Sequence, residues 1–244
     1  METVSLQSDG EVAIITLDDG KANALALAEF AALNAALDEV ERSHARACVL
    51  AGRPGVFSAG FNLKVMPGLP VDEKRAWLQA LVQTSVRIWL FPVPVVAAVS
   101  GHAVAAGALL ALACEVRLFA AGPFHFAVNE VPIGLYAPTF AIELVRAAVP
   151  SNYVPHVILH GAEISPQEAL TIGIAEALHP PEELLLAATA RARELSALAG
   201  PGYALTKQTL YGERVRYALA RLDDELPQHV RFFEQMQAQR RESV

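Results

Sequence analysis

The sequence has few charged residues, few aromatic residues and only two cysteines. Its 19 basic and 26 acidic residues give a net charge of −7 at pH 7, which disfavours a nucleic-acid partner, because nucleic-acid surfaces normally carry a basic stripe. Aromatic residues make up 7% of a chain that is 53% hydrophobic, so we expect a large and mostly aliphatic core. Cys48 and Cys114 lack CxxC spacing. We interpret both as buried thiols in a reducing compartment, and we expect the protein to be cytoplasmic.

The sequence also lacks the signature of a secretion signal, because residues 1–10 carry acids and no apolar run. Residues 88–114 contain no Asp, Glu, Lys or Arg, and their length alone would allow a membrane span. Prolines and polar residues interrupt that run. We therefore interpret residues 94–100 as a buried strand and residues 106–114 as a buried helix, and we expect no membrane partner.

Common catalytic motifs are missing as well. The chain has neither a GxxxxGK nor a GxGxxG phosphate loop, and Ser58 lacks the spacing of a GxSxG nucleophile. His156 and His160 would share one helix face, but no HExxH motif and no third ligand accompany them. We therefore expect no metal site and no separate cofactor.

Strand and helix patterns alternate along most of the chain, which is typical of an α/β protein. Asp9-Gly10 predicts a hairpin turn between two short strands. Ser165, Pro166 and Glu168 form the pattern of a helix start. The other expected elements are a helix at 27–40, a strand at 47–52, a helix at 72–91, and strands at 115–121 and 124–128.

The C-terminal part changes character. From Pro181 onward nearly all of the sequence has a helical pattern, broken at residues 200–202. Leucines recur along this tail and predict more apolar surface than a lone appendage would expose. We therefore divide the chain into a core at 1–180 and a helical oligomerisation region at 181–244.

Two loops can present backbone N–H groups to a ligand. One is the segment 52–66, and the other is the run of small residues "GHAVAAGALL" at 101–110, which joins a strand to a helix. N–H groups at the start of a helix have no partner within the helix, so two such turns facing each other would form an oxyanion hole. The alternative is two ordinary turns whose small residues allow tight packing.

These two loops, "CVLAGRPGVFSAGFNLKVM" and "PVVAAVSGHAVAAGALLALACEVRL", resemble the crotonase family, the enoyl-CoA hydratase/isomerase group. The resemblance implies an α/β fold made of a spiral of ββα units with a C-terminal helical trimerisation region. It also implies acyl-CoA thioester substrates, with coenzyme A as part of the substrate, and assembly as a homotrimer or a dimer of trimers.

By the same resemblance, backbone N–H groups of Phe61 and Ala106 would bind the thioester oxygen. Family members usually have glycine at the second position, but alanine leaves the N–H group in place. Lys64 and the "KANAL" loop match positions that contact coenzyme A in the family. The substrate-binding residues expected in this way are Lys21, Ala22, Ala24, Ala59, Gly60, Asn62, Leu63, Lys64, Gly107 and Leu109.

The resemblance also bears on the base that would remove a proton from the substrate. Hydratases of this family use two glutamates, and Leu109 occupies the first of these positions here. The second aligns with Glu130 in "FAVNEVPIGLYAP", a segment similar to the Δ3,Δ2-enoyl-CoA isomerase branch, which has one glutamate. We expect the apolar neighbours of Glu130 to raise its pKa, and these neighbours are Val128, Val131, Ile133 and Leu135.

One carboxylate can move a double bond, because the same base can remove a proton from C2 and return it at C4. Adding water also requires a group that holds the water. The sequence therefore predicts an enoyl-CoA isomerase with Glu130 as its catalytic base. Three alternatives stay open. The first is a hydratase, which is a type of lyase, whose water is held by another group. The second is a related enolate chemistry such as hydrolysis or decarboxylation, and the third is a weakly catalytic acyl-CoA-binding protein.

Overall fold

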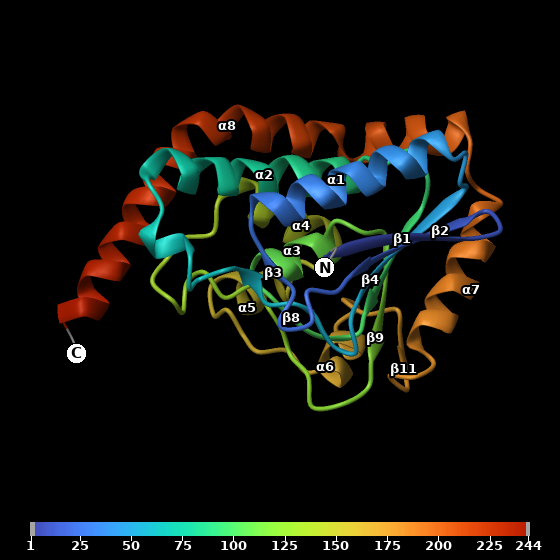
Figure 1. The fold of residues 1–244 in the computed structure, drawn as a ribbon, viewed down its shortest axis with the longest axis horizontal. Helices are drawn as coiled ribbons and strands as arrows, with labels where there is room; N and C mark the ends of the chain where they lie inside the picture. Colours follow the sequence, from blue (N-terminus) through green and yellow to red (C-terminus); the bar gives the residue numbers. More distant parts are fainter. Residues whose placement is uncertain (1–2, 243–244) are drawn as a thin grey trace.

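A six-stranded sheet forms the centre of the computed structural model, which describes residues 3–242 (Figure 1). β1 and β2 form the expected antiparallel hairpin, with Gly10 at φ 63° in the turn, and the other neighbouring strands are parallel. The strand order across the sheet is β1 (Val4–Asp9), β2 (Val12–Leu17), β4 (Ala47–Gly52), β7 (Val95–Val99), β9 (Val116–Ala120) and β11 (Ala177–His179).

Two smaller parallel sheets lie beside the large one. The first has the order β10 (Phe126–Ala127), β8 (Gly101–Val104) and β5 (Gly55–Ser58), and the second pairs β3 (Ala24–Leu25) with β6 (Gly60–Phe61). The chain repeatedly visits the large sheet, then a small sheet, then a helix, as in β2–β3–α1, β7–β8–α3 and β9–β10–α4. This repetition confirms the expected spiral of ββα units.

Helices surround the sheets, and their ends follow local sequence signals. Ser165 caps one of them by accepting a hydrogen bond of 3.2 Å from the Glu168 N–H, with Pro166 at the first helical position. The helices are α1 (Leu27–Arg42), α2 (Val71–Trp89), α3 (Ala106–Leu112), α4 (Thr139–Ala148), α5 (Val154–Ile158), α6 (Pro166–Thr171), α7 (Leu184–Ser196) and α8 (Pro201–Glu242), with a short 3-10 helix at Met66–Gly68.

The central strands are buried on both faces, which explains their continuous apolar sequence. In β4, Cys48 and Leu50 face the core that contains α1, α2, α3 and α4, while Ala47 and Val49 face α7. α7 therefore covers the second face of the sheet, and the edge strand β11, which the sequence did not predict, extends the sheet along β9. Residues 181–242 are mostly helical, as expected, whereas the role of the region 181–244 in oligomerisation stays a prediction.

The uncharged stretch 88–114 holds the end of α2, strands β7 and β8, and the buried helix α3. The expected strand at 94–100 and helix at 106–114 are thus confirmed, with slightly shorter bounds. Over residues 3–242, no helix has both the length and the apolar character that crossing a membrane requires.

Candidate active site

A cavity of about 130 Å³ lies between the small sheets and helices α2, α3, α4 and α8. Its wall is mostly apolar, with polar side chains from Asn129, Glu130 and His229. The apolar residues that the sequence did not single out include Met66, Leu78, Leu81, Val104, Pro138, Phe140 and Phe233. The cavity thus has the character of a binding site for an apolar ligand with a few polar contacts.

Several residues expected from the sequence share the wall of this cavity, namely Phe61, Ala106, Glu130, Ala59, Leu63 and Leu109. Gly60, Asn62 and Gly107 lie directly beside these residues in the chain. Lys21, Ala22, Ala24 and Lys64 do not line the cavity, and the side chains of Lys21 and Lys64 are exposed. The part of these outer residues in binding coenzyme A stays a prediction.

The two predicted loops approach each other at Gly60. A Cβ atom on Gly60 would lie 2.8 Å from the Val104 carbonyl oxygen and 3.2 Å from the Ala106 nitrogen, and Gly60 has φ 81°. Ala106 is the first residue of α3, so its N–H group has no partner within that helix. Phe61 and Ala106 therefore line the same cavity, where their backbone N–H groups can donate hydrogen bonds to an anionic oxygen.

The residue before Ala106 is strained. Ala105 has φ 49° and ψ −120°, a conformation that costs a non-glycine residue about 1–3 kcal/mol. Such strain persists only where the surrounding structure enforces it, and here it sets the direction of the chain as it enters α3.

The glycines in the run of small residues serve the packing of the two loops. A Cβ atom on Gly107 would lie 2.4 Å from the Ser58 carbonyl oxygen, and one on Gly101 would lie 2.0 Å from the Gly55 carbonyl group. Tight packing, which the sequence left open as an alternative, therefore accounts for both glycines. Of the four alanines in the run, Ala105 and Ala106 line the cavity.

Glu130 is buried, and its Oε2 atom has no hydrogen-bond partner among the described residues. Burial in this apolar wall raises the pKa of Glu130 to about 7, against the weaker lowering effect of its own backbone N–H group. Leu109 is buried in the same wall. The cavity therefore contains a carboxylate of raised pKa and a leucine at the position that would hold a second acid.

The apolar neighbours of Glu130 are partly those expected. Ile133 and Leu135 line the cavity, and Val128 is buried. The expectation for Val131 is wrong, because this residue is 40% exposed. The chain turns here, with the Gly134 N–H donating to the Val131 carbonyl at 3.0 Å, so that Glu130 faces the cavity and Val131 faces outward.

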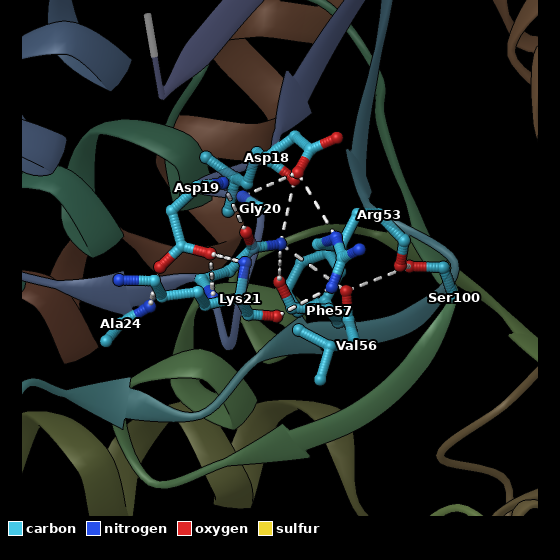
Figure 2. Close-up of polar contacts among 11 residues, drawn as sticks. Asp18, Asp19, Gly20, Lys21, Ala24, Arg53, Val56, Phe57 and Ser100 are labelled. Carbon is cyan, nitrogen blue, oxygen red and sulfur yellow. Dashed lines mark hydrogen bonds and ion pairs between the residues drawn. The ribbon is translucent and has the colours of Figure 1, made fainter. Parts of the chain in front are cut away.

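The loop that carries Lys21 is held in place by hydrogen bonds (Figure 2). Asp19 accepts bonds from the backbone N–H groups of Lys21 and Asn23 at 2.7 and 2.9 Å, and Arg53 donates to the Lys21 carbonyl at 2.8 Å. Partial burial would raise the pKa of Asp19, but the backbone N–H bonds outweigh it and lower the pKa. These hydrogen bonds hold the backbone around Lys21 in a defined arrangement.

Sequence reasoning missed His229, which reaches the cavity from α8. Pro227 lies inside this helix, and Figure 1 shows its last part, drawn in red, turning away from the line of the first part. The helical spacing of Leu226, His229, Val230 and Phe233 could have indicated the histidine, because it places a polar residue on an otherwise apolar face.

Comparisons with known proteins agree with this architecture. Residues 7–244 match the family model described as Enoyl-CoA hydratase/isomerase. Enoyl-CoA hydratase domain-containing protein 3, mitochondrial, of Rattus norvegicus is 33% identical over 214 residues, which are 86% of this chain and 70% of that protein.

Two solved structures are similar over nearly the whole chain. A Mycobacterium tuberculosis protein, described as an enoyl-CoA isomerase in one solved structure and as a probable enoyl-CoA hydratase in another, has in the first a TM-score of 0.86 and 32% identity, covering 91% of this chain and 96% of that one. Human mitochondrial delta3-delta2-enoyl-CoA isomerase has a TM-score of 0.90 and 25% identity, covering 99% of this chain and 98% of that one.

Proposed function

Because the chain belongs to the enoyl-CoA hydratase/isomerase family, we propose that it moves the double bond of an enoyl-CoA thioester from C3 to C2. The observation that carries this proposal is the single unpartnered carboxylate of Glu130, which faces an apolar cavity with Leu109 in the same wall. One carboxylate is sufficient for an isomerase, because the proton that it removes is the proton that it returns.

In the proposed mechanism, the thioester oxygen accepts hydrogen bonds from the N–H groups of Phe61 and Ala106. The Glu130 carboxylate takes a proton from C2, and the electron pair of that C–H bond gives a dienolate whose negative charge rests on the thioester oxygen. One such N–H donor typically stabilises the transition state by about 3–4 kcal/mol. Protonated Glu130 then delivers the proton to C4, which leaves the double bond between C2 and C3.

The environment of Glu130 suits both halves of this reaction. Its pKa of about 7 makes the ionised and protonated forms similar in free energy near neutral pH, which is the optimum for a group that acts first as base and then as acid. The apolar wall formed by Leu109, Ile133 and Leu135 also keeps water away from the dienolate.

Asn129 favours a second candidate, an enoyl-CoA hydratase. Its Oδ1 atom is buried in the same cavity wall and has no partner in the described part of the chain. This oxygen could accept a hydrogen bond from a water molecule held for attack on C3, which is the role that a second glutamate has in hydratases of the family. A weakly catalytic acyl-CoA-binding protein is the remaining alternative.

The two reactions can be separated by assaying one preparation with 3-hexenoyl-CoA for isomerisation and with 2-hexenoyl-CoA for hydration. We expect wild-type protein to isomerise the first ester and to hydrate the second poorly or not at all. Efficient hydration without isomerisation would contradict the proposal and support the hydratase, in which case Asn129→Leu should abolish hydration. Binding of both esters without turnover would support the binding protein.

Leu109→Glu tests whether the missing acid sets the reaction. We expect this variant to gain some hydration, but only partially, because a new buried carboxylate without partners costs several kcal/mol or stays protonated. Leu109→Gln is the matched control, since it is similar in size and polarity but has no acid, and we expect no gain from it. Equal gains in both variants would contradict the role assigned to the missing acid.

We also propose that the protein assembles as a homotrimer or a dimer of trimers. Of the C-terminal leucines, Leu184 is buried against the sheet, whereas Leu186, Leu205 and Leu210 are 75%, 64% and 63% exposed. Covering these side chains in an assembly would remove them from water. Light scattering that shows a monomer at micromolar concentration would contradict the proposed assembly.

We also propose a cytoplasmic location, which fits the buried free thiols of Cys48 and Cys114.

A further inference from the structure

The proposed mechanism does not give a role to every polar side chain in the cavity wall. Three buried side-chain atoms of its wall lack hydrogen-bond partners in the described structure: Glu130 Oε2, Asn129 Oδ1 and His229 Nδ1. Buried polar atoms in proteins almost always have a partner, so each of these three atoms points to a group that arrives with a ligand. Glu130 is the proposed base and Asn129 is its neighbour in the chain. His229 belongs to a different part of the wall.

His229 lies where the cavity meets a small void. It lines both spaces, together with Leu78, Pro138 and Phe140, whereas Phe61, Ala106 and Glu130 line only the main cavity. His229 therefore stands on the wall between the two spaces, away from the groups of the proposed chemistry. A ligand whose thioester sits at Phe61 and Ala106 would meet this wall with its acyl chain.

Two polar side chains beside His229, those of Tyr136 and Glu225, are engaged in other hydrogen bonds. The Tyr136 ring packs edge-on against the imidazole, with ring centroids 5.2 Å apart, and its hydroxyl donates to the Glu225 carbonyl at 2.9 Å. The Glu225 carboxylate, one helical turn before His229, accepts bonds from the backbone N–H and the hydroxyl of Thr139. These bonds leave the histidine side chain available to a ligand.

The imidazole is neutral under physiological conditions. His229 is 6% exposed, and this burial lowers its pKa to about 4. A neutral imidazole has one N–H donor and one acceptor nitrogen, so it can bind a hydroxyl group through either atom and a carbonyl oxygen through the donor. A plain hydrocarbon chain would leave the buried Nδ1 atom without a partner, which is unfavourable.

We propose that His229 binds an oxygen atom carried by the acyl chain, so that the preferred substrates are acyl-CoA thioesters with a hydroxyl or carbonyl group beyond the reacting carbons. This inference rests on the proposed function, because it takes the cavity to be the acyl site. The cavity of about 130 Å³ is close to the roughly 150 Å³ that holds benzene in an engineered protein. The acyl group is therefore short, with about six carbons, and its oxygen lies near the end.

The test uses saturated thioesters, which bind without being isomerised or hydrated, so its result does not depend on the reaction that the enzyme catalyses. The probes are hexanoyl-CoA, its 4-, 5- and 6-hydroxy derivatives, and 5-oxohexanoyl-CoA, and the measurement is the dissociation constant by calorimetry. For wild-type protein we expect at least one oxygenated ester to bind about three- to tenfold more tightly than hexanoyl-CoA, the factor that one buried hydrogen bond supplies.

Two variants of His229 and one control variant test whether this histidine causes the preference. His229→Leu should reverse it in favour of hexanoyl-CoA, and His229→Asn, which keeps a hydrogen-bonding atom near the Nδ1 position, should restore part of it. Phe140→Leu is the matched control, because Phe140 lines the same two spaces without a polar atom. We expect this control to change the affinity for all esters and to leave their ratio within about twofold.

Two results would overturn the inference: a wild-type affinity for hexanoyl-CoA equal to or higher than that for every oxygenated ester, or the same preference in wild type and His229→Leu. Failure to bind any of the esters would overturn the acyl-CoA assignment and the inference with it. The expected preference for an oxygenated ester, without turnover of 3-hexenoyl-CoA, would overturn only the proposed isomerase reaction and would support the inference.

Discussion

Glu115, whose side chain is 19% exposed, and the buried Glu130 have opposite hydrogen-bond arrangements. Glu115 accepts bonds from the Val95 N–H at 2.9 Å and the Tyr203 hydroxyl at 2.7 Å, and it forms an ion pair with Lys207. Glu130 has a buried Oε2 atom with no partner in the described residues. The first arrangement is that of a structural group, and the second is that of a group whose partner is a ligand. Hydrogen bonding of the carboxylate oxygens, together with the degree of burial, separates the two roles.

The Glu115 cluster connects the start of α8 to the rest of the fold. Lys207 also donates to the Phe91 carbonyl at 2.9 Å, and burial lowers its pKa while Glu115 opposes that shift. A charge pair of this kind contributes little when complete, but removing one partner leaves the other charged and buried. We therefore expect mutations in the Glu115 cluster to lower the stability of the fold, and mutation of Glu130 to lower catalysis.

The largest expected effect is on catalysis at Glu130. Glu130→Gln keeps the size and the hydrogen bonding of the side chain but removes its basicity. We expect turnover of 3-hexenoyl-CoA to fall by about 10²- to 10⁴-fold, with the affinity for hexanoyl-CoA nearly unchanged. Glu143→Gln is the control, because Glu143 is also buried but pairs with Arg146 and Arg214 outside the cavity. Turnover like that of the wild type in Glu130→Gln would place the base elsewhere.

The next effect is on folding at the Glu115 cluster. Lys207→Met keeps much of the side-chain volume and leaves Glu115 without its cation, so we expect the free energy of unfolding to fall by about 3 kcal/mol. Turnover per folded molecule should stay the same. Lys74→Met is the matched control, since the Glu234 partner of Lys74 has a 44% exposed side chain and keeps its hydration. Denaturant titrations should show a clearly smaller loss in that control, and equal losses would contradict the comparison.

An effect of similar size and opposite sign, confined to alkaline pH, is expected for the stability of Glu130→Gln. In the folded wild type the pKa of Glu130 is about 7, above its ordinary value of 4.5. The stability that this group contributes is therefore fully present below pH 4.5 and is lost as the pH rises through 7. The glutamine variant does not titrate, so we expect it to be more stable than wild type by about 3 kcal/mol at alkaline pH, and similar below the ordinary pKa. Denaturant unfolding at equal protein concentration measures the difference, and a constant difference at all pH values would contradict the raised pKa.

Much of this structure was predictable from local sequence. The hairpin at Asp9-Gly10, the cap at Ser165 and the buried strand at 94–100 depend on neighbouring residues. The positions of Glu130 and Leu109 followed from a family resemblance, and both line the cavity.

Other features depend on contacts between distant parts of the chain. His229 and Phe233 of α8 line a cavity whose other walls come from residues between Ala59 and Phe140, far away in the sequence. The exposed position of Val131 follows from a turn, whereas the sequence had placed this residue among the apolar neighbours of Glu130.

The most direct test of the account is the pH dependence of kcat/KM for wild-type isomerisation of 3-hexenoyl-CoA. The base must be ionised in the free enzyme, and the pKa of Glu130 is about 7. We therefore expect kcat/KM to be constant at alkaline pH and to fall about tenfold per pH unit below 7. His229, with a pKa of about 4, would not contribute to this fall. A kcat/KM value that stays constant down to about pH 5 would contradict the claim that an unpartnered, desolvated Glu130 is the base.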